Sequence, residues 1–384
     1  MSDLRHIAVV TGSRADYGLL SGLMLALNER PKVSLQVIVT GMHLHERFGL
    51  TIDEIRDDGM AITATVPILE DGDSELNVIN SVGRGIVGLA ETFVKLATDL
   101  VVVLGDRTET LAAAQAAMLL RIPLAHIHGG ESTEGAVDDL IRHAVTKMAH
   151  HHFVAAEPYR RRVVQMGENP AHVHLVGAPG LDDIQLLSFK SVGELEAEFN
   201  FNLSSGPILL LTYHPVTLDP KASVGGIRAL LKALKRFEGY RLVFTGVNSD
   251  AGREVITKLI GDFAADHDVL VRGSLGRVNY LSMLQAAVVL VGNSSSGIIE
   301  APALGIPTVN IGSRQDGRLR AASIKDCKED PDDIEAAIRY VLRPEFKTTW
   351  PDPLSLYGRG DTANQIADIL TNVELKFRKQ FYEW

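Results

Sequence analysis

The chain has 384 residues, of which 46% are hydrophobic and 22% are charged, so it is long and apolar enough for two buried cores. Its formal net charge of −10 argues against general nucleic-acid binding, because such proteins usually present a basic surface. The single cysteine, Cys327, excludes an intrachain disulfide, and no stretch approaches the roughly 20 apolar residues of a membrane span. We therefore expect a soluble, cytoplasmic protein that has neither nucleic acid nor a membrane as its partner.

The first half of the chain alternates short apolar runs with helical patterns. Strand-length apolar runs lie at residues 6–11, 33–41, 61–66, 100–104, 123–127, 152–155 and 174–176. Apolar residues with helical spacing lie between them, at residues 17–28, 76–97, 111–120 and 137–149. Continuous apolar strands that alternate with helices are typical of a parallel sheet covered on both faces.

The alternation stops at a charged helix predicted over residues 192–199 and then restarts. Strands are predicted at residues 207–212, 241–245, 269–272, 288–292 and 308–311, the last of which closes the series. Helices are predicted at residues 224–237, 252–264 and 278–285, with one more that ends near Leu304. The pattern predicts two Rossmann-like, doubly wound α/β domains, residues 1–180 and 205–361, that face a cleft. A final helix within residues 362–384 is expected to pack back on the first domain.

Asp106 follows the strand predicted at residues 100–104 directly. Ligands of open α/β sheets bind at the carboxyl ends of the strands, where a carboxylate can act as a general base or orient one. The competing interpretation is an N-cap for the next helix, which Thr108 would supply equally well. Arg107 beside it is either a salt-bridge partner or a clamp for a diphosphate.

Two histidines, His126 and His128, stand at the end of the strand predicted at residues 123–127, and Glu131 follows. An H-x-H pair raises the question of a metal ion, but two histidines alone do not make a zinc site. The chain also lacks the H-E-x-x-H pattern and thiolate pairs of zinc sites. The sequence therefore predicts no metal and favours acid/base chemistry.

Asp138 and Arg142 are four residues apart on a predicted helix and share a face. An ordinary intrahelical ion pair is one interpretation. The other is a group of carboxylates near one strand end, Asp138 with Glu131 and Asp139, whose pKa values are shifted for proton transfer.

In the second half, the sequence GNSSSG at residues 292–297 lies between a predicted strand and a predicted helix. Small residues, hydroxyls and a helix N-terminus favour a phosphate cradle, whereas serine there is also a common N-cap. Glu300, one turn on, is either a ribose contact or a favourable charge near the helix start. His214 precedes Pro215 and so lies in an extended turn, and Arg14 is either an anion contact or a solvated charge.

Together these motifs resemble a known family. The matching segments are TGSRADY at 11–17, GDR at 105–107, HIHGGE at 126–131, IRH at 141–143, HPVT at 214–217 and GNSSSG at 292–297. In order and spacing they are similar to the hydrolysing UDP-N-acetylglucosamine 2-epimerases of sialic acid biosynthesis. The resemblance implies the GT-B arrangement of two Rossmann-like domains. It also implies conversion of the UDP-sugar to N-acetylmannosamine and UDP, without metal, nicotinamide or any other cofactor.

The resemblance implies roles for individual residues. The residues expected in catalysis are Asp106, His128, Glu131, Asp138, Arg142 and His214. Those expected to bind the UDP-sugar are Arg14, Arg107, His214, Ser294, Ser295, Ser296, Gly297 and Glu300. This chain departs from the family at one position, because some relatives carry glutamate where His128 stands. Either the imidazole takes over that proton transfer or Glu131 does.

Three other functions remain open at the level of sequence. The same reaction on UDP-2,4-diacetamido-2,4,6-trideoxyglucose, as in legionaminic acid synthesis, would use the same motifs. A glycosyltransferase of the same fold would release UDP only when an acceptor is present, and a UDP-sugar sensor would bind without turnover. Relatives are commonly homodimers or homotetramers, and the apolar helices predicted at 76–97 and 111–120 are candidates for such an interface.

Overall fold

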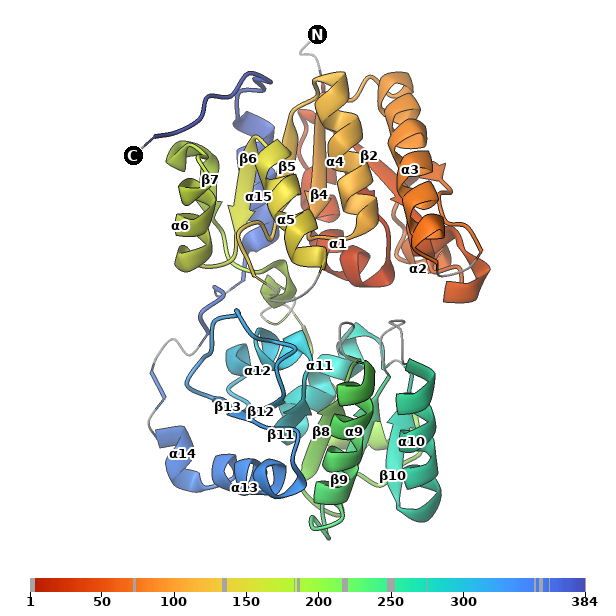
Figure 1. Ribbon diagram of the computed structural model, residues 1–384, viewed down its shortest axis with the longest axis vertical. Coiled ribbons are helices and arrows are strands. Elements are labelled where there is room, and N and C mark those ends of the chain that lie inside the picture. The colour runs from red at the N-terminus through yellow and green to blue at the C-terminus, as the bar shows by residue number, and fades with distance from the viewer. Residues whose placement is uncertain are drawn as a thin grey trace. The chain divides into compact units, whose positions relative to one another are not determined.

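The computed structural model describes residues 4–71, 74–132, 137–182, 184, 187–215, 220–246, 253–273, 275–348, 350–351, 355–358 and 360–383. Contacts divide the chain into two compact units. Unit 1 consists of Met1–Glu131, Val137–Asp182 and Tyr357–Trp384, and unit 2 consists of Ser132–Ala136 and Asp183–Leu356. Each unit contains one parallel sheet with helices on both faces (Figure 1).

The sheet of unit 1 has seven strands in the order β3-β2-β1-β4-β5-β6-β7, and every described pairing is parallel. The strands are β1 (Arg5–Thr11), β2 (Val33–Thr40), β3 (Ile62–Val66), β4 (Leu100–Leu104), β5 (Leu124–Ile127), β6 (His151–Val154) and β7 (Val173–Leu175). The helices are α1 (Arg14–Asn28), α2 (Ile52–Asp57), α3 (Glu75–Lys95), α4 (Thr108–Leu120), α5 (Val137–Met148), α6 (Glu157–Gln165) and α15 (Thr362–Asn372). The order reverses between β1 and β4, and such a switch point is where open α/β sheets bind ligands.

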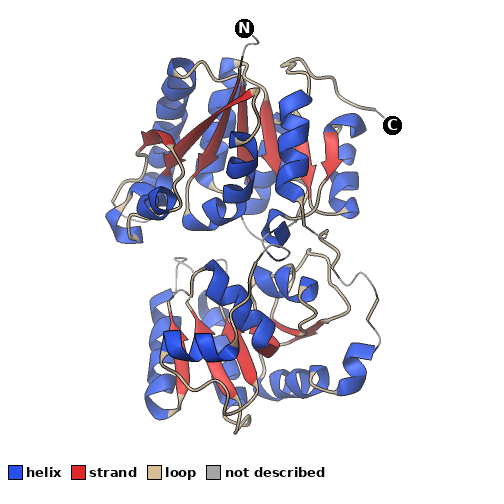
Figure 2. Ribbon diagram, turned by 180° about the vertical axis from the view of Figure 1, so that it is seen from behind, coloured by secondary structure: helices blue, strands red, loops and turns tan. Residues whose placement is uncertain are grey.

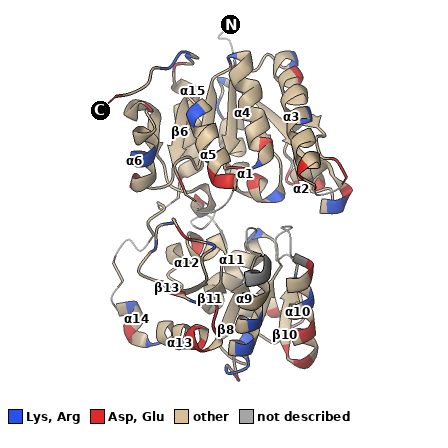
Figure 3. Ribbon diagram, in the orientation of Figure 1, with Lys and Arg blue, Asp and Glu red and all other residues tan. Residues whose placement is uncertain are grey.

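Two apolar layers cover the two faces of this sheet. Ile7 and Val9 of β1 point into one layer, together with residues of α1 and α15, while Ala8 and Val10 point into the other, with α3 and α4. Five alanines of α4, all 0% exposed, allow α3 and α4 to pack closely. Figure 3 shows that α4 carries no charge beyond its first turn.

The final helix α15 belongs to unit 1 because a side chain from a distant segment caps it. The Asp182 carboxylate accepts hydrogen bonds from the backbone N–H groups of Thr362 at 2.8 Å and of Ala363 at 2.6 Å. These are donors that a helix leaves unpaired at its N-terminus. The cap joins the end of the chain to the segment that follows β7, and α15 then packs on α1.

Figure 2 shows the strands in red, covered by helices in blue. The sheet of unit 2 has six strands in the order β10-β9-β8-β11-β12-β13. They are β8 (Ile208–Thr212), β9 (Arg241–Thr245), β10 (Val269–Arg272), β11 (Ala287–Gly292), β12 (Thr308–Ile311) and β13 (Ile324–Cys327). The helices are α8 (Val192–Phe199), α9 (Pro220–Leu234), α10 (Arg253–Asp266), α11 (Arg277–Ala286), α12 (Glu300–Ala303), α13 (Pro331–Val341) and α14 (Pro344–Thr348). The switch point here lies between β8 and β11.

The doubly wound α/β fold predicted from sequence is confirmed, but the prediction that residues 308–311 form the last strand is wrong. Strand β13 follows and pairs in parallel with β12 at the sheet edge. Its two central residues, Lys325 and Asp326, are exposed, so it lacks the continuous apolar run by which buried strands are recognised. Among the described residues, no helix is both long and apolar enough to cross a membrane.

Candidate active site

An ion pair between a buried arginine and a partly buried aspartate at the carboxyl end of β4 joins two of the predicted catalytic residues. Arg142 of α5 donates to the Asp106 carboxylate through Nη2 and to the backbone oxygen of His128 through Nη1, the latter at 2.8 Å. The Arg142 side chain is only 5% exposed. A buried guanidinium depends on its partner, and removal of one member of such a pair typically costs 3–5 kcal/mol.

These contacts decide between the interpretations of Asp106 and Arg142. The cap position of α4 falls on Arg107, so Asp106 does not serve as the N-cap. The Arg142 guanidinium reaches across to β4 and to the end of β5, so a simple pair within its own helix does not describe it. Asp138 lies one turn earlier in α5 and is exposed, in the acidic first turn that Figure 3 shows in red.

His128 and Glu131 form a second buried pair just after β5. The Glu131 carboxylate is hydrogen-bonded to His128 Nδ1, and the two residues are 2% and 8% exposed respectively. His128 has φ +66°, a left-handed conformation that is uncommon for residues other than glycine. Such strain clusters at functional positions, where a side chain is kept in spite of its cost. The structure therefore couples the two groups that the sequence presented as alternatives.

A third acidic group lies at the carboxyl end of β1 and was missed by sequence reasoning. Asp16, in the first turn of α1, is 9% exposed and lies 3.5 Å from Nε of Arg107. Burial raises its pKa to about 6, with Glu109 adding to the rise and Arg107 opposing it. Asp16 stands within the TGSRADY segment, but a carboxylate in a first helical turn is ordinarily explained by the helix dipole.

Arg14, which was predicted to contact an anion, makes an ion pair with Glu54 of α2 at 3.0 Å, and both side chains are about half exposed. Arg107 is 40% exposed despite its contact with Asp16. Of the two arginines, Arg107 stands directly beside Asp106 and the switch point.

In unit 2, Asn293 holds the turn that carries His214. The His214 N–H donates to Asn293 Oδ1 at 2.7 Å, and Asn293 Nδ2 donates back to the His214 carbonyl at 2.9 Å. Burial lowers the pKa of His214 to about 3, with Arg314 lowering it further, so this imidazole is neutral at physiological pH. Asn293 was quoted within the serine motif, but its link to a turn some eighty residues away is visible only in the fold.

The serine loop is a compact turn that begins at the end of β11. Ser294 Oγ accepts a hydrogen bond from the Ser296 N–H at 3.3 Å, and Tyr280 donates to Ser296 Oγ at 2.6 Å. Ser294 therefore does cap a turn, a 3₁₀ turn at Ser295–Gly297. A Cβ on Gly297 would lie 2.6 Å from Thr308 Cγ2, which gives this glycine a packing role.

The helix predicted to end near Leu304 is present but short. Helix α12 spans four residues, Glu300–Ala303, and a 3₁₀ turn at Ser295–Gly297 precedes it, so the N-terminus of this helix does not lie directly at the serines. Glu300 is its first residue and pairs with Arg277 at 3.2 Å. The polar groups that this segment presents are the hydroxyl and N–H groups of the loop and these two side chains.

Within the described ranges, no group of three His, Cys, Asp or Glu side chains is arranged to hold a metal ion.

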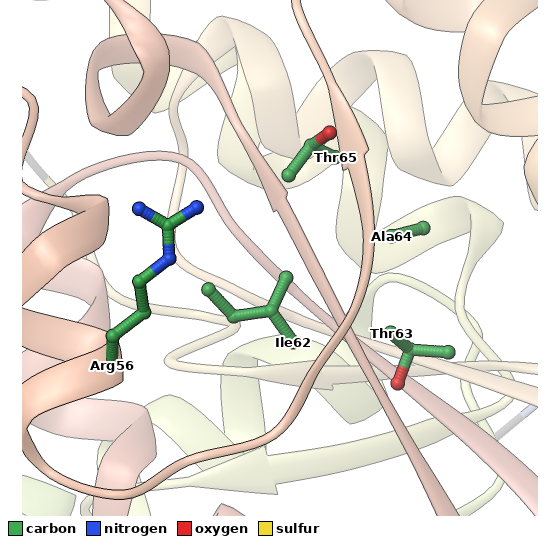
Figure 4. Close-up of a pocket in the computed structure, with 5 residues that line it drawn as sticks. All are labelled: Arg56, Ile62, Thr63, Ala64 and Thr65. Carbon is green, nitrogen blue, oxygen red and sulfur yellow. The ribbon is translucent and has the colours of Figure 1, made fainter.

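One open pocket lies at the free edge of the unit 1 sheet, lined by Arg56, Ile62, Thr63, Ala64 and Thr65 (Figure 4). Its lining includes none of the candidate residues, and β3 is at the opposite side of β1 and β2 from β4.

Two parallel sheets with polar clusters at their strand ends place the chain in the class of two-domain Rossmann-like enzymes. The structure of the UDP-GlcNAc 2-epimerase from Neisseria meningitidis bound to UDP-GlcNAc shares this fold, with a TM-score of 0.82 at 18% identity. The match covers 95% of this chain and 99% of that one. The sequence profile of the UDP-N-acetylglucosamine 2-epimerases matches residues 25–371. The chain therefore belongs to the UDP-N-acetylglucosamine 2-epimerase family, and it is an enzyme of the 2-epimerase kind.

Three relatives are similar over most of the chain. The GDP/UDP-N,N'-diacetylbacillosamine 2-epimerase (hydrolyzing) of Campylobacter jejuni is 37% identical and covers 89% of each chain. The UDP-N,N'-diacetylbacillosamine 2-epimerase (hydrolyzing) of Legionella pneumophila is 34% identical and covers 97% of each. The polysialic acid biosynthesis protein P7 of Escherichia coli is 36% identical and covers 89% of this chain and 88% of its own.

The raised pKa of Asp16 predicts a specific dependence of stability on pH. Its folded-state pKa of about 6 lies above the unfolded value, so its stabilising contribution is present at pH 4 and is lost as the pH rises through 6. The variant Asp16→Asn should gain about 2–3 kcal/mol relative to the wild type between pH 4.5 and 7.5. Urea denaturation across this range measures the difference. Asp57→Asn, at an exposed site on α2, is the control, and a difference that is flat for both variants would contradict the assignment.

Proposed function

We propose that the protein is a hydrolysing 2-epimerase that converts a UDP-2-acetamido sugar to UDP and the free sugar inverted at C2. The observation that carries this proposal is the two ion pairs at the carboxyl ends of β4 and β5, Asp106 with the buried Arg142 and the buried His128 with Glu131. Binding alone does not require ionisable groups to be buried there. Two relatives at 37% and 34% identity are named as hydrolysing enzymes, which supports water as the second reactant.

The reaction needs two proton transfers at C2 and a stabilised leaving group. A base removes the C2 proton, the C–H electron pair forms the C1–C2 double bond, and the C1–O bond breaks with its electrons on UDP. The product of this elimination is a 2-acetamidoglucal. Water then adds its hydroxyl at C1 while an acid protonates C2 from the other face. No electron enters or leaves, so the scheme uses no redox cofactor.

The two ion pairs indicate which residues carry the two proton transfers at C2. Glu131 holds Nδ1 of His128, so the ring presents Nε2 to a substrate, in the manner of a carboxylate that orients a catalytic histidine. Asp106, held by Arg142, is the second proton-carrying group. Asp138, exposed on α5, is the alternative to Asp106 for this second transfer.

The remaining candidate residues are assigned to UDP. In unit 2, the hydroxyl and N–H groups of Ser294, Ser295, Ser296 and Gly297 and the neutral His214 are proposed to bind the phosphates. In unit 1, Arg14 and Arg107 are the proposed anion contacts. Donors aimed at the β-phosphate lower the barrier, because negative charge develops there as UDP leaves. Glu300 is proposed to accept hydrogen bonds from the ribose.

Two sugars are candidates within this chemistry. UDP-N-acetylglucosamine, which would give N-acetylmannosamine for sialic acid biosynthesis in the cytoplasm, is supported by the similarity to protein P7 of Escherichia coli. The diacetamido-trideoxy sugar of bacillosamine type is supported by the names of the Campylobacter and Legionella relatives. Both carry the same groups at C1 and C2, so the same proton chemistry serves either.

Turnover of the two UDP-sugars side by side distinguishes these candidates. We expect UDP to appear in the phosphorus NMR spectrum with no acceptor added, together with a free sugar inverted at C2. UDP release that requires an added sugar or peptide acceptor would instead establish a glycosyltransferase. A preference of more than about tenfold in kcat/KM for one UDP-sugar, equivalent to about 1.4 kcal/mol, identifies the substrate.

The variants His128→Gln and Glu131→Gln test whether His128 or Glu131 carries the proton. Loss of a general acid or base typically costs 10²–10⁴-fold in rate, so His128→Gln should lower kcat by at least about 100-fold. Glu131→Gln, which keeps a hydrogen-bonding partner for Nδ1, should lower kcat by about tenfold. His143→Gln on α5 is the matched control and should keep wild-type kcat. If the loss in Glu131→Gln exceeded that in His128→Gln, Glu131 would be the proton carrier.

We also propose that the enzyme is a homo-oligomer in which a second copy covers the outer face of α3. Four apolar side chains on this helix are about 60% exposed, at Leu76, Ile79, Val87 and Val94, with Gly83 continuing the same stripe. The opposite stripe already packs in the core, so the helix is apolar on two sides.

Size-exclusion chromatography coupled to light scattering measures the molar mass of the assembly. The wild type should elute as a dimer or tetramer, and Ile79→Glu with Val87→Glu should shift it to the monomer. Leu25→Glu, at an exposed leucine of α1, is the control. A wild type that stays monomeric at concentrations of tens of micromolar would contradict the interface.

A further inference from the structure

One buried titratable group at the centre of unit 1 has no part in the proposed reaction. His126, on β5, is 0% exposed, and both of its ring nitrogens are engaged by protein groups. Nε2 lies 2.8 Å from the carbonyl oxygen of Gly105, the residue before Asp106. Nδ1 lies 3.1 Å from Oγ1 of Thr146 on α5, one turn after Arg142.

The partners determine the state of the ring. A carbonyl oxygen can only accept, so Nε2 carries the proton and donates to Gly105. Burial lowers the pKa of His126 to about 3, so the ring is neutral and Nδ1 is an acceptor that faces the Thr146 hydroxyl, whose single proton is shared between Nδ1 and the Arg142 carbonyl at 2.9 Å. The imidazole therefore spans two segments with one donor and one acceptor, in a single tautomer.

The same contact also supports the turn that carries His128. A Cβ on Gly129 would lie 3.0 Å from Thr146 Oγ1 and 3.2 Å from His126 Nδ1, so the backbone of the turn rests closely against this hydrogen bond. The Gly105 N–H donates in turn to the Ile127 carbonyl at 3.0 Å. His126 thus contacts the segments that bear Asp106, His128 and Arg142.

We infer that His126 is a positioning residue for the proposed 2-epimerase reaction: its two hydrogen bonds hold the Asp106 turn and the Arg142 helix at a fixed separation. This inference rests on the proposed function, because its kinetic effect is defined for that reaction. The physical reason is preorganisation. Catalytic groups work only within a narrow geometry, and small displacements lower the rate without weakening remote binding contacts.

Substitutions can separate the two hydrogen bonds. A glutamine amide reaches as far as imidazole Nε2, so His126→Gln keeps a donor for Gly105 and loses the link to Thr146. Thr146→Val removes the hydroxyl from a residue that is 0% exposed at nearly constant shape, and Thr146→Ser restores it. His126→Leu removes both bonds.

The matched control is His152→Gln. His152 is also 0% exposed, lies beside His126 on the neighbouring strand β6, and bonds to Glu168 at 3.1 Å rather than to a site turn. It therefore reproduces the loss of a buried imidazole from the same sheet without touching the segments of Asp106 and Arg142.

We expect His126→Gln and Thr146→Val each to lower kcat about tenfold with KM within twofold of the wild type, and Thr146→Ser to recover most of the rate. His152→Gln should lose thermal stability to a similar degree and keep its kcat. Equal kcat values in His126→Gln, Thr146→Val and His152→Gln would overturn the inference and leave His126 with a role in stability alone.

Hydrogen exchange gives a second readout that needs no substrate. Exchange should rise in peptides covering residues 104–110 and 127–132 in His126→Gln and Thr146→Val, but not in His152→Gln. Unchanged exchange there would overturn the inference even if activity fell. Were the wild type inactive on both UDP-sugars, the proposed function would fail, while the exchange pattern would still decide whether His126 positions these turns.

Discussion

A guanidinium that is almost fully withdrawn from water determines how the candidate active site is built. Burial of a guanidinium such as that of Arg142 requires a carboxylate and further acceptors at close range. Asp106 supplies the charge and the His128 carbonyl supplies the acceptor. Three elements that meet at the carboxyl edge of the sheet, β4, β5 and α5, are therefore held in one arrangement by a single side chain.

In each unit, hydrogen bonds of a neutral side chain also hold a turn that carries candidate site residues. His126 bonds to the Asp106 turn and to α5 in unit 1, and Asn293 bonds twice to the His214 backbone in unit 2. Burial lowers the pKa of His126 and of His214 to about 3, so both imidazoles are neutral. Such groups lower a barrier by being in place before charge develops in the transition state.

Much of this architecture is predictable from local patterns. Apolar runs of strand length predicted nearly every central strand. The polar clusters that follow these runs identified Asp106, His128 and the serine loop as candidates for the site. Strand β13 was missed because Lys325 and Asp326 break its apolar run. The short α12 was not foreseen, because the 3₁₀ turn that replaces part of a longer helix has no separate signature in the sequence.

The hydrogen-bond and ion-pair partners of the candidate site residues were harder to predict from the sequence. Sequence spacing offered Asp138 as the partner of Arg142, since only contacts within a helix can be deduced from spacing. The pairing with Asp106 depends on how β4 and α5 pack. The coupling of His128 to Glu131 accompanies a left-handed φ at a histidine. The raised pKa of Asp16 follows from its burial in the fold, with Arg107 and Glu109 of a later segment acting on it in opposite directions.

The most direct test of proton chemistry at C2 is to run the reaction in heavy water and examine the sugar product by proton NMR. Elimination and readdition predict one deuterium at C2 of an inverted free sugar, with UDP released in equal amount. Asp106→Asn should form this product at least about 100-fold more slowly, as expected for loss of a general acid or base. An inverted sugar that retains its original C2 hydrogen would contradict the mechanism, and with it the role given to the two ion pairs of unit 1.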